Sequence, residues 1–179
     1  MKILIIGAGN GGLSFAAKLS ELGLKIVLYD KYLETILPII KNNNIITLVE
    51  EKKEKKVRLF FATNDLSKAV EDIDLTFIVT PAFAHQSVAR DLATFLSDNH
   101  HIILHPGRTG GALEFRNTLK NYKIHPTVAE TETLLFACRK IHATKIQIYG
   151  VKKSVGLAAI PSEKSMELVN ILNKYLPYY

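Results

Sequence analysis

The sequence contains a single cysteine, Cys138, among its 179 residues. One cysteine cannot form an intramolecular disulfide, and it cannot provide the several thiolates of a cysteine-based metal site. The apolar neighbours of Cys138 instead favour a small, buried side chain. We therefore expect neither a disulfide-stabilised fold nor a metal site.

Long hydrophobic runs are also lacking. A membrane-spanning helix needs about 18 or more consecutive apolar residues, and no segment approaches that length. The apolar run at residues 3–6 is too short for the core of a secretion signal, because glycines and Asn10 follow it. These absences predict a cytoplasmic protein that does not interact with membranes.

The chain has no concentrated basic tract, although 23 Lys and Arg against 17 Asp and Glu give a formal net charge of +6. The densest charged stretch, residues 50–56, mixes both signs between two apolar runs. We interpret it as a solvated hairpin turn and expect no nucleic-acid partner. A mildly basic surface is compatible with anionic substrates and cofactors.

Short apolar runs alternate with helical patterns along most of the chain. The predicted strands are residues 3–6, 25–29, 45–49, 57–62, 75–79, 102–104 and 126–129. The predicted helices are residues 13–22, 32–42 with a kink or end at Pro38, a short one capped by Thr63 or Asn64, 85–96 and 112–122. This alternation indicates an α/β fold, a Rossmann-type doubly wound, mostly parallel sheet with strand order 3-2-1-4-5-6.

The last third of the chain departs from that alternation. Residues 145–149 and 154–160 are β-rich and flank a glycine-containing turn, which predicts an antiparallel hairpin appended to the sheet. Ser162 is the expected cap of a final helix. The abrupt end after that helix suggests a chain cut from a longer protein. We expect residues 1–179 to form one dinucleotide-binding domain.

A glycine-rich segment, GAGNGG, lies between the first strand and the first helix. The cofactor-binding residues expected there are Gly7, Gly9, Asn10, Gly11 and Gly12. Gly7 permits the tight turn, Gly9 lets a pyrophosphate approach the backbone, and Gly12 allows close packing of helix on sheet. The phosphates would sit on free amides at a positive helix end.

Asp30 ends the second strand, 18 residues after Gly12. A carboxylate there accepts hydrogen bonds from the adenosine ribose and repels a 2′-phosphate, which favours NAD. The neighbouring Lys31 could accommodate that phosphate, so NADP stays an alternative.

Ligands of such sheets bind beyond the carboxyl ends of the strands. This rule adds Thr80, Pro81, Ala82 and Phe83 after one strand, and Pro106 and Gly107 after the next, to the expected cofactor site. Phe83 is either a wall of the pocket or a packed core aromatic.

Three polar residues near these strand ends are candidate contacts to substrate or cofactor. His105 suits a structural hydrogen bond better than proton transfer. Arg108 lies beside glycines at the start of a helix, where free amides and its guanidinium would bind an anion. Its alternative role is an ion pair with Glu114 or Glu130, and Glu130 itself lies at a strand end.

Four segments, GAGNGG, PGRTGGALEF (106–115), AETETLLFACR (129–139) and KKSVGLAAIP (152–161), together resemble the octopine/nopaline (opine) dehydrogenase family. The resemblance implies an NAD(P)H-dependent reductive condensation of an amino acid with a 2-oxo acid. It also implies a helical second domain, which carries the catalytic histidine and its carboxylate partner. No catalytic residue is therefore assigned within this chain, and we expect no turnover without that domain.

Two other functions remain open at this stage. Glycerol-3-phosphate dehydrogenases and ketopantoate reductases also place a helical domain after a GxGxxG domain, although the PGRTGG segment disfavours them. A stand-alone NAD-sensing module would suit this length, but the additional hairpin and final helix disfavour it. An apolar surface left uncovered by a missing domain would favour a homo-oligomer.

Overall fold

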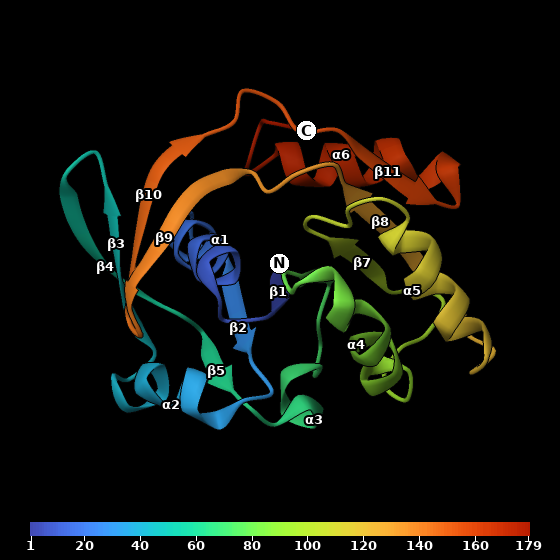
Figure 1. Ribbon diagram of the computed structural model, residues 1–179, viewed down its shortest axis with the longest axis horizontal. Helices are drawn as coiled ribbons and strands as arrows, with labels where there is room; N and C mark the ends of the chain where they lie inside the picture. Colours follow the sequence, from blue (N-terminus) through green and yellow to red (C-terminus); the bar gives the residue numbers. More distant parts are fainter. The chain divides into compact units, whose positions relative to one another are not determined.

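The computed structural model describes residues 1–179, which form two compact units. The first comprises Met1–Asp74 and Phe136–Lys152, and the second Leu75–Leu135 and Lys153–Tyr179. The fold is α/β, with a mostly parallel main sheet and a second, mixed sheet (Figure 1). The predicted fold class is confirmed.

The first unit supplies three parallel strands of the main sheet, paired in the order β1, β2, β5. They are β1 (Lys2–Ile6), β2 (Lys25–Tyr29) and β5 (Phe61–Thr63). The helices of this unit are α1 (Asn10–Glu21), α2 (Leu33–Lys41) and α3 (Leu66–Ala69). This order is the 3-2-1 half of the predicted arrangement.

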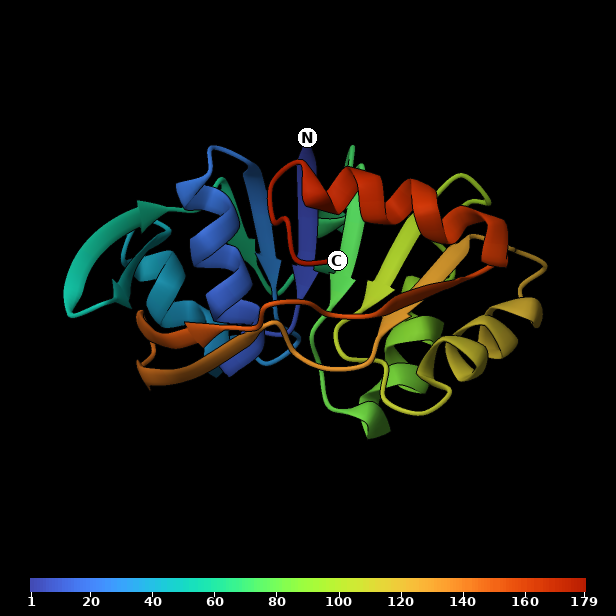
Figure 2. The same ribbon diagram turned by 90° about the horizontal axis from the view of Figure 1, so that it is seen from above.

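The mixed sheet also belongs to the first unit, and its strands follow the order β4, β3, β10, β9. Their bounds are β3 (Ile45–Glu50), β4 (Lys53–Arg58), β9 (Phe136–His142) and β10 (Lys145–Val151). Both ribbon views show β9 and β10 beside α1 (Figures 1 and 2). Phe136 of β9 packs edge to face on Phe15 of α1, with ring centroids 4.8 Å apart.

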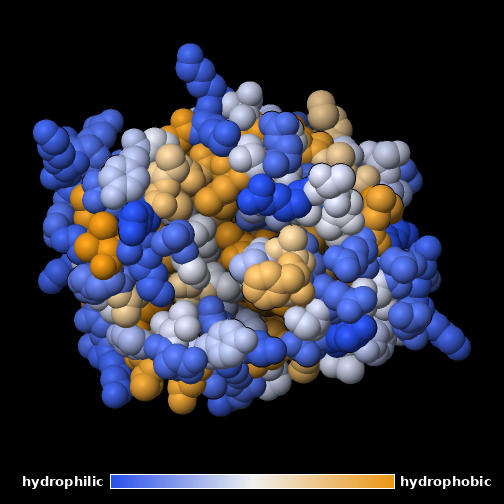
Figure 3. Space-filling view, viewed as in Figure 1, coloured by the Kyte–Doolittle hydropathy of each residue, from blue (hydrophilic) through white to orange (hydrophobic).

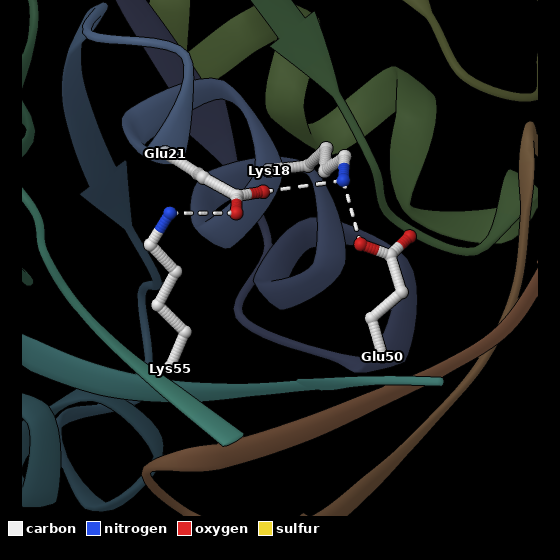
Figure 4. A network of polar contacts seen from close by, with 4 residues as sticks. All are labelled: Lys18, Glu21, Glu50 and Lys55. Atoms are coloured by element: carbon white, nitrogen blue, oxygen red, sulfur yellow. Dashed lines mark hydrogen bonds and ion pairs between the residues drawn. The ribbon is translucent and has the colours of Figure 1, made fainter. Parts of the chain in front are cut away.

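An ion-pair network joins α1 to the mixed sheet (Figure 4). Lys18 Nζ lies 3.1 Å from Glu21 and 2.7 Å from Glu50, and Lys55 Nζ lies 2.9 Å from Glu21. Because Glu50 belongs to β3 and Lys55 to β4, the network fixes the outer face of α1 against that hairpin. Single surface pairs stabilise by at most about 1 kcal/mol, but coupled ones restrict geometry more strongly.

The second unit pairs β6, β7 and β8 in parallel, the 4-5-6 half of the predicted order, and adds β11 antiparallel to β8. The strands are β6 (Leu75–Ile78), β7 (His101–Leu104), β8 (Thr127–Thr131) and β11 (Leu157–Ile160). The helices are η1 (Ala82–Ala84), α4 (His85–Leu92), α5 (Gly111–Lys120), η2 (Ser162–Lys164) and α6 (Ser165–Asn173). Figure 2 shows α6 on one face of these strands and α4 and α5 on the other.

The predicted hairpin of residues 145–149 and 154–160 is wrong. The first segment lies in β10, which pairs antiparallel with β9 and parallel with β3, whereas the second contains β11, which pairs with β8. Residues 150–153 therefore connect two different sheets. Strand β9 was not predicted, because its sequence, FACRKIH, alternates too weakly to indicate a strand.

Several predicted boundaries also differ from the structure. Residues 57–62 are not one strand, because β4 ends at Arg58 and β5 begins at Phe61. The charged turn is confined to residues 51 and 52, both with positive φ. Asp65, rather than Thr63 or Asn64, caps α3, through a 3.1 Å bond from the Ser67 amide. Ser162 opens a 3₁₀ turn instead of capping α6.

None of the helices has the length and apolar character needed to cross a bilayer. On the face drawn in Figure 3, charged and polar residues surround several separate hydrophobic groups. That mixture agrees with the ordinary composition of the chain, of which 47% is hydrophobic and 22% charged.

Replacing Gly12 by alanine should destabilise the fold strongly. An ideal Cβ on Gly12 would lie 1.7 Å from the Gly7 carbonyl oxygen, so helix α1 would have to move away from the loop. We expect a loss of about 3 kcal/mol or more in the free energy of unfolding, measured by urea denaturation. The matched control is Gly9→Ala, whose Cβ meets nothing within 4 Å and should cost no more than about 1 kcal/mol. Equal losses in the two variants would contradict the close-packing role of Gly12.

Candidate dinucleotide site

The glycine loop turns sharply out of β1 into α1. The Gly7 amide donates to the Tyr29 carbonyl of β2 at 2.8 Å, and Gly7 then adopts a φ of +104°. L-residues other than glycine rarely adopt that conformation, so the turn requires glycine at this position. Gly12 follows in the first turn of α1, directly against the Gly7 carbonyl.

The first turn of α1 offers amide donors without acceptors. The Leu13 amide donates to the Gly9 carbonyl at 3.0 Å, whereas those of Asn10, Gly11 and Gly12 meet no acceptor in the protein. No acidic side chain occupies that turn, and no side chain caps it. An ideal Cβ on Gly9 would meet nothing within 4 Å, and the free amides at this helix end favour a phosphate group electrostatically.

Asp30 is fixed beside the loop by two backbone amides. Its Oδ2 accepts from Ala8 at 2.8 Å, and its Oδ1 accepts from Tyr32 at 3.0 Å. Each oxygen retains a further lone pair for a ribose hydroxyl. Lys31 is exposed, and its ammonium lies 5.8 Å from the centre of the Tyr32 ring.

The second unit carries the strand-end residues expected to contact the cofactor. Thr80 and Pro81 follow β6, and Ala82 and Phe83 lie in the short helix η1. Phe83 is 89% exposed, so the alternative of a packed core aromatic is wrong for this structure.

His105, Pro106 and Gly107 follow β7. His105 is fully buried, and its Nε2 is hydrogen-bonded to the Tyr179 hydroxyl at 2.8 Å. Burial lowers the pKa of His105 to about 3 and raises that of Tyr179, so both groups are neutral near pH 7. Gly107 packs on Glu130, whose Cβ lies 2.3 Å from the position of an ideal Cβ on the glycine. Gly107 therefore has no room for a side chain.

The predicted anion position at the start of α5 is taken by the chain itself. Glu130 Oε2 accepts a hydrogen bond from the Ala112 amide at 2.7 Å. A carboxylate suits the positive end of a helix, so Glu130 stabilises α5 in the place where an external anion was expected. Arg108 is exposed and pairs with neither Glu114 nor Glu130, so the alternative role of an ion pair is not found in the structure.

Sequence reasoning missed Lys140 of strand β9. Its amide donates to Asn10 Oδ1 at 2.8 Å, and its Nζ donates to the Ala8 carbonyl at 3.0 Å. The Cys138 thiol donates to the Asn10 carbonyl at 3.4 Å, and burial raises its pKa. The side chain of Asn10 therefore fixes β9 on the loop. Burial alternates with a period of two through Phe136, Cys138 and Lys140, but the sequence of this strand alternates too weakly to have indicated it.

The family model described as ketopantoate reductase PanE/ApbA matches residues 3–147. The chain belongs to this family. It is 33% identical over 176 residues to an opine dehydrogenase of Arthrobacter sp. (strain 1C), a match that covers 98% of this chain and 49% of the relative. The chain thus spans about half the length of that relative.

Solved structures show the same fold. An octopine dehydrogenase with NADH and L-arginine has a TM-score of 0.84 at 21% identity, covering 97% of this chain and 45% of the other. A yersinopine dehydrogenase with NADP⁺ has a TM-score of 0.79 at 18% identity, covering 98% and 46%. The predicted resemblance to the N-terminal NAD(P)-binding domain of opine dehydrogenases is confirmed.

The buried histidine should make stability depend on pH. The unfolded His105 takes up a proton below its ordinary pKa of about 6.5, whereas the folded one does so only near 3. Lowering the pH between these values therefore favours the unfolded chain, by up to about 1.4 kcal/mol per pH unit. His85, whose pKa burial also lowers, acts in the same direction.

Urea denaturation at pH values between about 7 and about 4 measures this dependence. The variant His105→Gln should reduce the slope of the free energy of unfolding against pH. His142→Gln, at an exposed position of β9, controls for the loss of one imidazole. An unchanged slope in His105→Gln would show that its imidazole titrates alike in the folded and unfolded chains.

Proposed function

We propose that this chain is the NAD(P)-binding part of an opine-type dehydrogenase, in which NAD(P)H reduces the product of condensing an amino acid with a 2-oxo acid. One observation carries the proposal: a glycine loop with three free helix amides and a fixed Asp30, in a chain that matches an opine dehydrogenase over 98% of its length. The octopine dehydrogenase structure with NADH and L-arginine supports this substrate class.

Each unit has its own set of proposed cofactor contacts. The glycine loop provides the pyrophosphate position, and Asp30 binds the adenosine ribose. In the second unit, the proposed cofactor contacts are Thr80, Pro81, Ala82 and Phe83, with Pro106 and Gly107. Arg108, exposed and without an acidic partner, is the proposed contact to a substrate carboxylate or a cofactor phosphate.

Catalysis is proposed to need groups beyond these 179 residues. His105 is a poor general acid near pH 7, because its pKa of about 3 leaves it without a proton to give. Residues 1–179 would then act as one dinucleotide-binding domain, with the bound nicotinamide supplying the hydride when the cofactor is present. The proposed location is the cytoplasm.

A substrate screen of the purified chain tests whether residues 1–179 bind the cofactor without catalysing the reaction. NADH absorbance is followed with 2-oxo acids plus amino acids, with ketopantoate and with dihydroxyacetone phosphate. We expect saturable NADH binding and no turnover with any of them. Turnover with one class would place the catalytic groups within this chain and would identify that class as its substrate.

Asp30→Ala should weaken NADH binding by roughly tenfold and NADPH binding much less, because the lost carboxylate binds a ribose hydroxyl but repels a 2′-phosphate. Fluorescence titration with both cofactors measures the two dissociation constants. Glu163→Ala, an exposed residue with the same change of charge, is the control. Equal losses for NADH and NADPH would count against the role of Asp30 in favouring NAD.

A further inference from the structure

One face of strand β9 lies against α1 and its glycine loop. Phe136 is buried, and Cys138 and Lys140 are half-buried, whereas Ala137, Arg139 and other alternate residues are exposed. Phe136 contacts Phe15, and Cys138 and Lys140 reach Asn10. The inward face of β9 therefore brings one cationic side chain, Lys140, to the loop.

Lys140 bonds to both sequence neighbours of Gly9, the residue at which a ligand is expected to approach the backbone. Its main-chain amide bonds to Asn10 on one side of Gly9, and its ammonium bonds to the Ala8 carbonyl on the other. A Cβ on Gly9 would meet nothing within 4 Å, so the surface that Lys140 borders is open. The ammonium group is thus bonded to the loop directly before Gly9, the residue that precedes the free α1 amides.

The charge of Lys140 has no acidic partner. Lys18, Lys55 and Lys145 of the same unit each pair with a glutamate, but the only acceptor of the Lys140 ammonium is a neutral carbonyl. No acidic residue lies in the first turn of α1 either. The positive end of the helix and this ammonium therefore add, and the acid beside the loop, Asp30, bonds to the Ala8 amide and forms no ion pair with Lys140.

We infer that Lys140 is a cofactor-binding residue whose ammonium binds the pyrophosphate of the dinucleotide. The inference rests on the proposed function. It adds to the glycine loop a cation from a distant strand, since Lys140 lies 132 residues after Ala8 and 130 after Asn10 in the sequence. A half-buried ammonium whose two remaining N–H groups are free forms a strong charge-assisted bond to a phosphate oxygen.

The pyrophosphate fits better than the 2′-phosphate of NADP. Lys140 bonds to Ala8 and Asn10, the neighbours of Gly9 in the loop, whereas Asp30, bonded to the Ala8 and Tyr32 amides, is the residue proposed to hold the ribose. NADH, NADPH and ADP-ribose all contain the pyrophosphate, and adenosine contains no phosphate. Loss of Lys140 should therefore weaken the first three by the same factor and spare adenosine.

The test compares Lys140→Met with Arg139→Met, which removes the same charge from the exposed face of the same strand. Fluorescence titration gives the affinities of NADH and NADPH, and displacement of NADH gives those of ADP-ribose and adenosine. We expect Lys140→Met to weaken the three pyrophosphate ligands by roughly tenfold at low salt and adenosine by less than about twofold. Arg139→Met should change every affinity by less than about twofold. Near 1 M salt, where the Debye length is about 3 Å, the effect of Lys140→Met should shrink.

Two outcomes would overturn the inference alone. In the first, the native chain binds NADH and Lys140→Met binds it as well as Arg139→Met does. In the second, Lys140→Met loses adenosine and ADP-ribose equally, which would make Lys140 a residue that shapes the loop. If the native chain binds neither NADH nor NADPH, the proposed function fails and this inference fails with it. Thermal melting of the unliganded variants checks that both fold like the native chain.

Discussion

The contact between Gly12 and the Gly7 carbonyl constrains the cofactor-binding half of this structure. It lets α1 start immediately after β1, because no side chain separates the helix from the turn. The amides of the first helical turn then have no carbonyls before them in the helix to accept their hydrogens. A bulkier residue at position 12 would separate helix and loop, and the donor set would lose its geometry. The fold and the proposed phosphate site thus depend on the same close approach.

Two further elements hold the loop in place from opposite sides. Asp30 accepts from the Ala8 amide, and Lys140 donates to the Ala8 carbonyl, so both polar groups of one loop residue are bonded to side chains distant in sequence. Asn10 is held in turn by β9. A binding loop whose backbone is fixed before the ligand arrives loses less conformational entropy on binding. The mixed sheet therefore does more than extend the first unit, since its last strand supports the loop.

Sequence patterns predicted correctly those elements whose structure depends on neighbouring residues. The glycine segment between β1 and α1, the acid that ends β2 and the parallel strand order within each unit follow from spacing and apolar runs. Strand β9 and the partner of β10 depend on pairing between distant segments, and periodicity carries no information about such pairing. The appended hairpin was predicted from adjacency in sequence, but β10 and β11 each found a partner elsewhere. Lys140 was not predicted for the same reason, because its bonds to the glycine loop form only when β9 packs on α1.

In the second unit, a side chain of the protein occupies the anion position that the glycine-rich helix start offers. The glycines before α5 expose amides much as those before α1 do, yet Glu130 reaches back from β8 and bonds to the Ala112 amide. Gly107 has no space for a side chain, because Glu130 packs directly against it. At α1 the first turn lacks both an acid and a capping side chain, and the loop before it bonds to the cation Lys140 as well as to Asp30. Two similar helix starts therefore differ: at α5 a carboxylate of the protein occupies a first-turn amide, whereas the first-turn amides of α1 stay free for the proposed anionic ligand.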